Sequence, residues 1–370
     1  MIRIPQNIRE IANYKPGKPA ADMFDGKEQT KQAILCSNEN NFGSSPLAKA
    51  AIEEALSNVY LYPDPTGEGL KRKIGEKYGY RQDQLILGNG SDGILYTMFK
   101  AFFEPGEHLL TSEATFVSLH AMAKMNNVEI KSVPMKTGYA FDLDAIYAAI
   151  TPETKVIYLC NPNNPTGAMI PQKDLVGFIE KVSNDKLIIV DEAYYEFSKD
   201  LSDQYPDSTK LGLDNVLTLR TFSKAYGLAG LRLGYGIGHP DIISTMHKVK
   251  LTFNPNVLAQ AAGISALDDD DFLNLTLSNN REGLQQFYKF FDRLGIDYIP
   301  SYANFVMLDL KDTDTVENTY EALRDKGVLT RRLGSFGLPH CLRVSIGRPE
   351  ENQWFMTCFE EVSHTLFTNV

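Results

Sequence analysis

Short apolar runs separated by helical segments are the feature that most limits what this chain can fold into. Strand-like runs lie at residues 84–87, 108–111, 128–130, 155–160, 186–190 and 216–219. Mostly apolar strands without polar alternation are typical of sheets that are buried on both faces. Helical segments between most of the runs indicate parallel strands joined by crossover helices. The sequence therefore predicts an α/β fold with a mostly parallel central sheet.

The character of the chain changes near residue 262. A long helical stretch at 272–294 precedes the strand-like segments 303–308 and 342–347. Strands mixed with amphipathic helices indicate a smaller α+β domain, and 370 residues are enough for two domains. The first ~40 residues are shorter than an independent core usually requires. We therefore expect an N-terminal arm at 1–42, a large domain at 43–261 and a small C-terminal domain at 262–370.

Charge and composition exclude several classes of partner. The net charge is −10 and no basic stretch offsets it, which argues against nucleic acid and anionic membranes. No apolar run approaches membrane-spanning length. The cysteines and histidines show no zinc-ligand spacing, and the run 268–271 lacks the interleaved oxygens of a calcium loop and is typical of a helix start. We expect a cytoplasmic protein with free thiols that binds no metal, nucleic acid or membrane.

Lys224 is the residue that first suggests a chemistry. It follows the run 216–219, with Ser223 beside it and Arg232 further along the segment 221–232. An amine can form a Schiff base with an aldehyde, whereas a hydroxyl and a guanidinium can hold a phosphate. Pyridoxal 5′-phosphate carries both groups. The segment therefore predicts a pyridoxal phosphate site.

Polar residues also follow two other strands and open one helix. The run 155–160 leads into a turn that places Asn164 against a ligand, and the run 186–190 leads to Asp191 and Tyr194. Segment 88–93 presents backbone N–H groups at a helix start, where a phosphate can bind. Each motif alone is compatible with an ordinary turn, cap or surface charge. Their joint occurrence at strand ends favours one shared ligand site.

These residues resemble the fold-type I pyridoxal phosphate enzymes, which are aspartate aminotransferase-like, and within them the histidinol-phosphate aminotransferases. The resemblance covers nearly the whole chain and implies a large domain with a mostly parallel sheet plus a smaller α+β domain. Segments 13–19 and 35–40 resemble that group's N-terminal arm and its Ser-Asn-Glu-Asn motif. Segment 61–64 resembles its Arg-Tyr-Pro site, with Leu61 in place of Arg, and 333–347 is similar to its substrate-binding end.

The resemblance implies roles for individual residues. Lys224 would bind the cofactor and move the substrate proton, Asp191 would pair with the pyridinium nitrogen, and Tyr194 would bind the phenolic oxygen. The rest of the implied cofactor site is Asn164 at the same oxygen, Phe116 and Ala193 at the ring, Ser91, Asp92, Gly93, Ser223 and Arg232 at the phosphate, and Tyr62 reaching the neighbouring subunit's phosphate. The implied substrate-binding residues are Tyr14, Asn40, Arg331 and Arg343.

The expected reaction is transamination of L-histidinol phosphate with 2-oxoglutarate in histidine biosynthesis. The products are imidazole-acetol phosphate and glutamate. The resemblance also implies a homodimer with shared active sites, in which each N-terminal arm packs on the small domain and on the partner subunit. Two departures are visible: Gly93 stands where the group usually has Glu, and Arg332 where Pro is common.

Two alternatives keep the fold: an aromatic amino-acid aminotransferase and a decarboxylase of O-phospho amino acids. Arg343 could serve a phosphate or a carboxylate, so the sequence separates these activities poorly. A pyridoxal phosphate-binding regulator without turnover is disfavoured, because the chain has no basic DNA-binding module.

Overall fold

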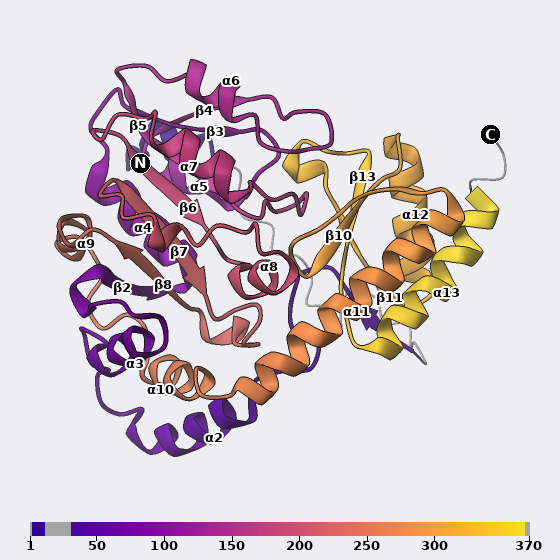
Figure 1. Cartoon of the computed structure of the whole chain (residues 1–370), viewed down its shortest axis with the longest axis horizontal. Helices are drawn as coiled ribbons and strands as arrows, with labels where there is room; N and C mark the ends of the chain where they lie inside the picture. Colours follow the sequence, from indigo (N-terminus) through magenta and orange to yellow (C-terminus); the bar gives the residue numbers. More distant parts are fainter. Residues whose placement is uncertain (1, 12–30, 367–370) are drawn as a thin grey trace.

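The computed structural model describes residues 2–11 and 31–366, and its centre is a seven-stranded sheet (Figure 1). The strand order is β2-β8-β7-β6-β5-β3-β4. The strands are β2 (Leu85–Asn89), β3 (His108–Ser112), β4 (Glu129–Val133), β5 (Thr154–Cys160), β6 (Leu187–Asp191), β7 (Val216–Thr221) and β8 (Leu233–Gly238). Strands β3 to β7 pair in parallel, whereas β8 runs antiparallel to both of its neighbours. The predicted mostly parallel sheet is confirmed.

Helices surround this sheet and share its apolar core. They are α4 (Gly90–Phe102), α5 (Ser118–Met125), α6 (Leu143–Ala148), α7 (Gln172–Ile179) and α9 (Pro240–His247). Helix α8 (Tyr195–Leu201) follows β6, and its Phe197 lies in a separate small cluster with Phe305. Ile94 and Met98 recur at helical spacing on α4 and pack in one buried cluster with Leu109 and Ile157 of the sheet. Each such side chain contributes about 1.5–3 kcal/mol when it is fully buried. The apolar runs of the sequence are thus the interior of the molecule.

Three further helices form a second buried cluster with β2 and β8. They are α2 (Pro46–Ala55), α3 (Glu68–Tyr78) and α10 (Val257–Ala266). Ala48, Leu70 and Ala259 are fully buried there together with Leu87 of β2 and Leu233 of β8. The short helices are α1 (Gln6–Arg9), η2 (Leu56–Asn58), η3 (Gln82–Gln84), η4 (Ser208–Lys210), η5 (Ala229–Leu231) and η6 (Gly334–Phe336).

The C-terminal part of the chain forms a four-stranded antiparallel sheet of order β12-β13-β10-β9. Its strands are β9 (Asp297–Ile299), β10 (Phe305–Asp309), β12 (Arg331–Arg332) and β13 (Cys341–Ser345). The helices α11 (Asp270–Leu294), α12 (Thr313–Asp325) and α13 (Pro349–Leu366) lie together beside it (Figure 1). Phe287, Phe355 and Val344 share one buried core with Ala33 and Leu35. Segment 33–35 therefore packs on the C-terminal part, where β1 (Ala33–Ile34) pairs in parallel with β11 (Val328–Leu329).

Helix α11 connects the two parts of the molecule (Figure 1). Its start lies in the acidic run, where Asp269 accepts a hydrogen bond from the backbone N–H of Phe272 at 3.1 Å and caps the helix. Its end is Gly295, which has the left-handed φ of +66° that glycine adopts without strain. The exact domain boundaries at 42/43 and 261/262 stay a prediction.

No helix within residues 2–11 and 31–366 combines the length and the apolar character needed to cross a membrane.

Candidate active site

A cavity of about 230 Å³ lies at the carboxyl ends of β5, β6 and β7. The last residue of each of these strands lines it: Cys160, Asp191 and Thr221. The cavity is also lined by most residues of the predicted cofactor site, which are Ser91, Asp92, Phe116, Asn164, Ala193, Tyr194, Ser223, Lys224 and Arg232. Parallel strands bring their carboxyl ends to one edge of the sheet, so residues far apart in sequence meet there.

Lys224 is half-buried beside the end of β7. Its Nζ donates a hydrogen bond to the backbone carbonyl of Ser37 at 3.2 Å. Burial lowers the pKa of Lys224 to about 8, and the nearby charges of Arg343 and Arg232 act in the same direction. A measurable fraction of the amine is therefore neutral and nucleophilic near neutral pH.

Asp191 is buried at the end of β6 and is held by two hydrogen bonds. Its Oδ2 accepts from the hydroxyl of Tyr158 at 2.7 Å, and its Oδ1 accepts from the backbone N–H of Ala193 at 3.1 Å. Burial raises the pKa of Asp191 to about 6, and both hydrogen bonds oppose this rise. The carboxylate is ionised at neutral pH and is suited to bind a buried cation.

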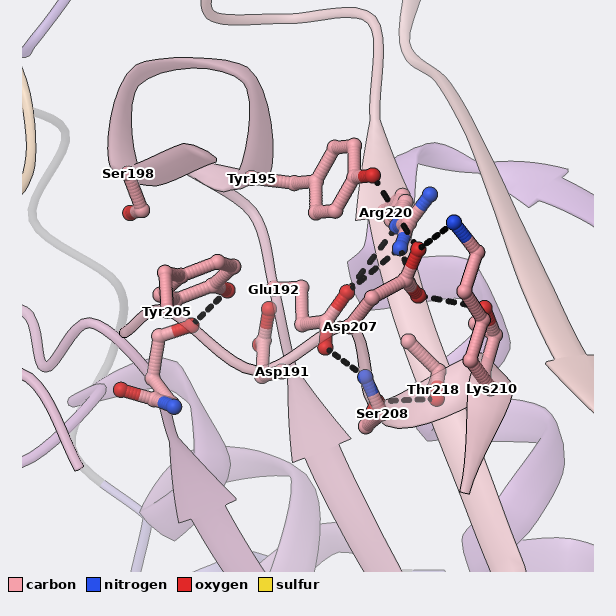
Figure 2. Close-up of polar contacts among 12 residues, drawn as sticks. Asp191, Glu192, Tyr195, Ser198, Tyr205, Asp207, Ser208, Lys210, Thr218 and Arg220 are labelled. Atoms are coloured by element: carbon pink, nitrogen blue, oxygen red, sulfur yellow. Dashed lines mark hydrogen bonds and ion pairs between the residues drawn. The ribbon is translucent and has the colours of Figure 1, made fainter. Parts of the chain in front are cut away.

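An ion-pair network lies beside this position (Figure 2). Glu192 follows Asp191 directly, and its Oε2 accepts from Arg220 of β7 while its Oε1 accepts from the backbone N–H of Ser208 at 2.9 Å. Arg220 also donates to Asp207 at 2.8 Å. The network ties the junction between β6 and α8 to β7, which fixes the backbone that carries Asp191.

The first turn of α4 meets Arg232 at the other side of the cavity. Nη2 of Arg232 lies 3.1 Å from Oδ2 of Asp92. Gly90 has a φ of +70°, and a Cβ there would lie 2.8 Å from Nη2 of Arg232, so a larger residue would strain the backbone and displace the guanidinium. Ser91 and Asp92 lie in the first turn of α4, where backbone N–H groups have no partner within the helix, and both residues line the cavity together with Arg232. This arrangement suits a phosphate group.

Arg343 of β13 is buried next to Asn164. Its Nη1 donates to Oδ1 of Asn164, and its Nη2 donates to the carbonyl of Cys36 at 2.9 Å. Burial lowers the pKa of Arg343 to about 10. Its buried Nε finds no hydrogen-bond partner among the described residues. An unpartnered guanidinium donor in this position suits an incoming anion.

Other predicted site residues lie outside the cavity lining. Gly93 lies in α4, where a Cβ would meet its nearest neighbour at an ordinary 3.4 Å. The amide of Asn40 donates to the carbonyl of Ala225 and to Thr276, at 3.0 and 2.9 Å. Arg331 is exposed on β12 and pairs in register with Arg343.

Tyr62 is 80% exposed, and its ring stacks on Phe253 with the ring centroids 4.3 Å apart. It does not line the cavity of this subunit. Tyr14 and segment 13–19 lie outside the described residues. Arg332, which stands where proline is common, pairs with Glu317 of α12.

Sequence reasoning assigned no site role to several residues found there, among them Asn38, Tyr158 and Thr221. Tyr158 stands in the apolar run 155–160, and a hydroxyl inside a buried strand needs a partner, which is a usable signal. Thr221 is the last residue of β7 and lines the cavity. Asn38 donates a hydrogen bond to the hydroxyl of Tyr194 at 2.9 Å, and nothing local in its sequence indicates this contact across 156 positions.

Comparison with known proteins agrees with this geometry. Residues 30–357 match the family described as aminotransferase class I and II. A curated histidinol-phosphate aminotransferase of Brevibacillus brevis is 39% identical over 360 residues, which cover 96% of this chain and 97% of the relative. The histidinol-phosphate aminotransferase 2 of Ralstonia nicotianae is 40% identical over 353 residues, 94% of each chain.

Among solved structures, a histidinol-phosphate aminotransferase of Sinorhizobium meliloti in complex with pyridoxal-5′-phosphate superposes with a TM-score of 0.91. The two chains are 28% identical, and the match covers 99% of each. An aspartate aminotransferase of Thermus thermophilus has the same fold, with a TM-score of 0.84 at 22% identity. The cavity at the strand ends is therefore the candidate active site of an enzyme, and this chain belongs to the class I and II aminotransferase family.

Proposed function

We propose that this enzyme transfers the amino group of L-histidinol phosphate to 2-oxoglutarate, giving imidazole-acetol phosphate and glutamate. The observation that carries the proposal is the meeting of Lys224, Asp191 and Arg232 in one cavity with Arg343 beside it. Near-full-length similarity to curated histidinol-phosphate aminotransferases supports the choice of substrate. The pathway would be histidine biosynthesis.

Pyridoxal 5′-phosphate is the cofactor, and the residues present fit its parts. The anion-binding turn of α4 with Arg232 and Ser223 fits the phosphate, and the buried carboxylate of Asp191 fits the pyridinium nitrogen. When bound, this cofactor supplies an aldehyde that reacts with amines and a cationic ring that withdraws electrons.

Lys224 is the proposed catalytic base and acid. Because its pKa is lowered to about 8, Nζ would be able to remove the proton from the substrate carbon that bears the amine. It would then deliver this proton to the cofactor carbon that carried the aldehyde. Asp191 would stabilise the positive charge of the cofactor's ring nitrogen, and Tyr158 orients Asp191 by donating a hydrogen bond to it. Tyr194 and Asn164 are proposed to bind the phenolic oxygen, with Phe116 and Ala193 on the ring faces.

Arg343 is proposed to bind the anionic end of the substrate. Its unpartnered Nε and its two terminal nitrogens form a donor set for a phosphate or a carboxylate. Arg331 is the second proposed cation, because it pairs in register with Arg343 and its charge contributes to the lowered pKa of Arg343. Asn40 and Tyr14 stay in the proposed substrate set on the family resemblance alone.

The active unit is proposed to be a homodimer. Large apolar side chains are exposed in the segment that precedes Tyr62 and in the segment of Phe253, on which Tyr62 stacks: Leu56, Val59, Tyr60, Leu61, Leu251 and Phe253. Exposed apolar clusters of this kind usually mark an interface. Tyr62 has no place in its own subunit's cavity, which is consistent with a role at the phosphate of a second copy. The arm at 1–42 would contribute to the same contact.

The proposal also covers domains and location. The two sheets with separate cores support a large domain at 43–261 and a small one at 262–370. The four cysteines are free, which supports a cytoplasmic location.

The test is the half-reaction of the purified enzyme with single amino donors. Conversion of the bound cofactor, followed by its change in absorbance, should be fastest with L-histidinol phosphate and should also proceed with glutamate. Faster conversion with phenylalanine or tyrosine would support an aromatic aminotransferase instead. Release of carbon dioxide from an O-phospho amino acid would support a decarboxylase.

A further inference from the structure

Asn38 reaches the active-site tyrosine from the segment that precedes α2. Its Nδ2 donates a hydrogen bond to the hydroxyl of Tyr194 at 2.9 Å, and the two side chains are 1% and 2% exposed. Asn38 has a φ of +56°, a left-handed conformation that asparagine adopts more readily than most residues. The contact is therefore built into a backbone position that restricts which residue can stand there.

Ser345 of β13 hydrogen-bonds the oxygen end of the Asn38 amide. The backbone N–H of Asn38 donates to Oγ of Ser345 at 3.0 Å, and that hydroxyl donates its single proton to Oδ1 of Asn38 at 2.9 Å. The amide oxygen therefore faces Ser345, and the NH₂ group faces Tyr194. Asn304 holds the same residue by donating to the carbonyl of Asn38 at 3.2 Å.

This orientation determines where the hydroxyl proton of Tyr194 can go. The oxygen of Tyr194 already accepts from Asn38, and no described residue accepts its proton. Tyr194 lines the cavity together with Asn164 and Asp191. Burial raises the pKa of Tyr194 to about 12, although Arg343 and the Asn38 hydrogen bond lower it, so the hydroxyl stays protonated at neutral pH. Tyr194 is thus a hydrogen-bond donor whose acceptor is not among the described residues.

We propose that Asn38 is a positioning residue that directs the proton of Tyr194 into the cavity, toward the phenolic oxygen of the cofactor. The inference rests on the proposed function, because it needs pyridoxal phosphate in this cavity. A donated hydrogen bond stabilises the anionic form of the phenolic oxygen and so lowers the pH at which the bound cofactor deprotonates.

Strand β13 carries both Ser345, which orients Asn38, and Arg343, which is proposed to bind the substrate's anion. Arg343 also contacts the N-terminal segment that carries Asn38, because its Nη2 donates to the carbonyl of Cys36. The orientation of the Tyr194 proton and the position of the substrate arginine therefore depend on one strand.

Two substitutions test the hydrogen bond between Asn38 and Tyr194. One reverses its direction, and the other removes it. Asn38→Asp offers a carboxylate that accepts the Tyr194 proton, so Tyr194 no longer donates to the cofactor. Asn38→Gly removes the amide at a φ that glycine tolerates. The measurement is an absorbance titration of the bound cofactor between pH 5 and 10, together with its dissociation constant. We expect the spectral pKa of the cofactor to rise by about one to two pH units in Asn38→Asp. A smaller rise is expected in Asn38→Gly.

Asn41→Asp is the matched control. Asn41 lies in the same segment, but its Nδ2 donates to the carbonyl of Ile34 and to the carboxylate of Glu351, at 3.3 and 2.8 Å. Asn41→Asp introduces the same negative charge as Asn38→Asp. It should lower the melting temperature of the protein and leave the spectral pKa of the cofactor unchanged.

The outcomes distinguish this inference from the proposed function. Wild-type spectral pKa values in both Asn38 variants would overturn the inference while leaving the function intact. The same would follow if both variants lowered only the melting temperature of the cofactor-free protein. A wild-type enzyme without cofactor absorbance would overturn the function and this inference together. If Asn38→Asp fails to fold, the Asn38→Gly variant decides the question. A spectral pKa equal to that of the wild type would overturn the inference, and a raised spectral pKa would support it.

Discussion

The guanidinium of Arg220 donates two hydrogen bonds to a single carboxylate oxygen of Glu192, 3.0 Å from Nε and 2.8 Å from Nη2, and both side chains are fully buried (Figure 2). The ring of Tyr195 covers the guanidinium, with its centroid 3.3 Å from Cζ. Burial opposes the charge of Arg220, but Glu192 and Asp207 raise its pKa, so the cation persists. Glu192 follows Asp191 directly, so the ion pair holds the end of β6 that carries Asp191.

Arg220→Ala should therefore destabilise the protein strongly. It leaves Glu192 buried without its main partner, and breaking a buried ion pair in this way costs about 3–5 kcal/mol. Arg281→Ala is the matched control, because Arg281 pairs with Asp200 at the surface and is 41% exposed. A surface pair contributes roughly 0–1 kcal/mol. Urea unfolding of the three proteins measures the difference, and equal midpoints for both variants would refute the assigned role of Arg220.

Lys224→Ala should abolish covalent capture of the cofactor. In the wild type, borohydride reduction should attach the cofactor irreversibly to Lys224, because it is the one lysine of segments 2–11 and 31–366 that lines the cavity. Peptide mass spectrometry after reduction identifies the labelled residue. Lys210→Ala is a suitable control, since Lys210 is 70% exposed beside Asp207. A label on another lysine would overturn the assignment of the site.

Cofactor affinity should weaken in acid through Asp191. Burial raises the pKa of its carboxyl to about 6, so the group gains a proton as the pH falls through 6 and loses its charge. A neutral carboxyl cannot pair with a cationic ring, so the dissociation constant should rise by up to about tenfold for each pH unit below 6. Fluorescence titration of the cofactor-free protein at several pH values provides the measurement.

Asp191→Asn is the reference for this experiment. It should bind the cofactor weakly at every pH, and the pH dependence that remains in it belongs to the ligand. An identical slope in wild type and variant would show that Asp191 does not govern binding.

Strand β8 is not predicted from the sequence. Its sequence is Leu-Gly-Tyr-Gly-Ile-Gly, and glycine at every second position hides the apolar pattern of a strand. The structure gives the reason: a Cβ on Gly234 would lie 2.6 Å from the backbone of Gly90 and Ser91 at the start of α4. The start of α4 can approach β8 this closely only because β8 carries glycine at Gly234. The same glycines make the strand hard to predict from the sequence.

The apolar runs were easier to interpret, because burial on both faces leaves a plain signal. β5, β6 and β7 lie within two residues of the predicted runs, and the cofactor residues that follow them meet in one cavity. Contacts between distant segments had no such signal. Asn38 and Ser345 are 307 positions apart, and their hydrogen bonds depend on how β13 packs against the N-terminal segment. Such pairings follow from tertiary structure alone.

Tyr62 tests the shared active site. Hybrid dimers of one Tyr62→Phe protomer and one Lys224→Ala protomer should contain one site free of both substitutions. The reason is that each site takes Lys224 from one chain and Tyr62 from the other. Activity recovered on mixing, measured against each parent and quantified with tagged protomers, is the expected result. Full activity in a species that sediments as a monomer would contradict the model of a shared site.

The two arginines should separate the amino donors. Histidinol phosphate has no carboxylate next to its amine, so its phosphate is the group that a bidentate arginine can bind. Glutamate offers carboxylates instead. Arg343 is buried beside Asn164 and is expected to serve both donors, whereas the exposed Arg331 should matter more for the doubly charged phosphate. Losing a hydrogen bond to a charged group costs about 1.5–3 kcal/mol, or roughly 10- to 100-fold in a rate constant.

Arg331→Ala should thus lower kcat/KM for histidinol phosphate more than for glutamate, and Arg343→Ala should lower both. Stopped-flow half-reactions with each donor measure the two ratios directly. Arg332→Ala is the matched control, because Arg332 is the neighbouring residue of β12 but binds Glu317 of α12 instead of facing a substrate. Equal losses for both donors in Arg331→Ala would remove Arg331 from phosphate recognition. A wild type that prefers phenylalanine would favour the aromatic aminotransferase, since Arg343 alone suffices for a carboxylate.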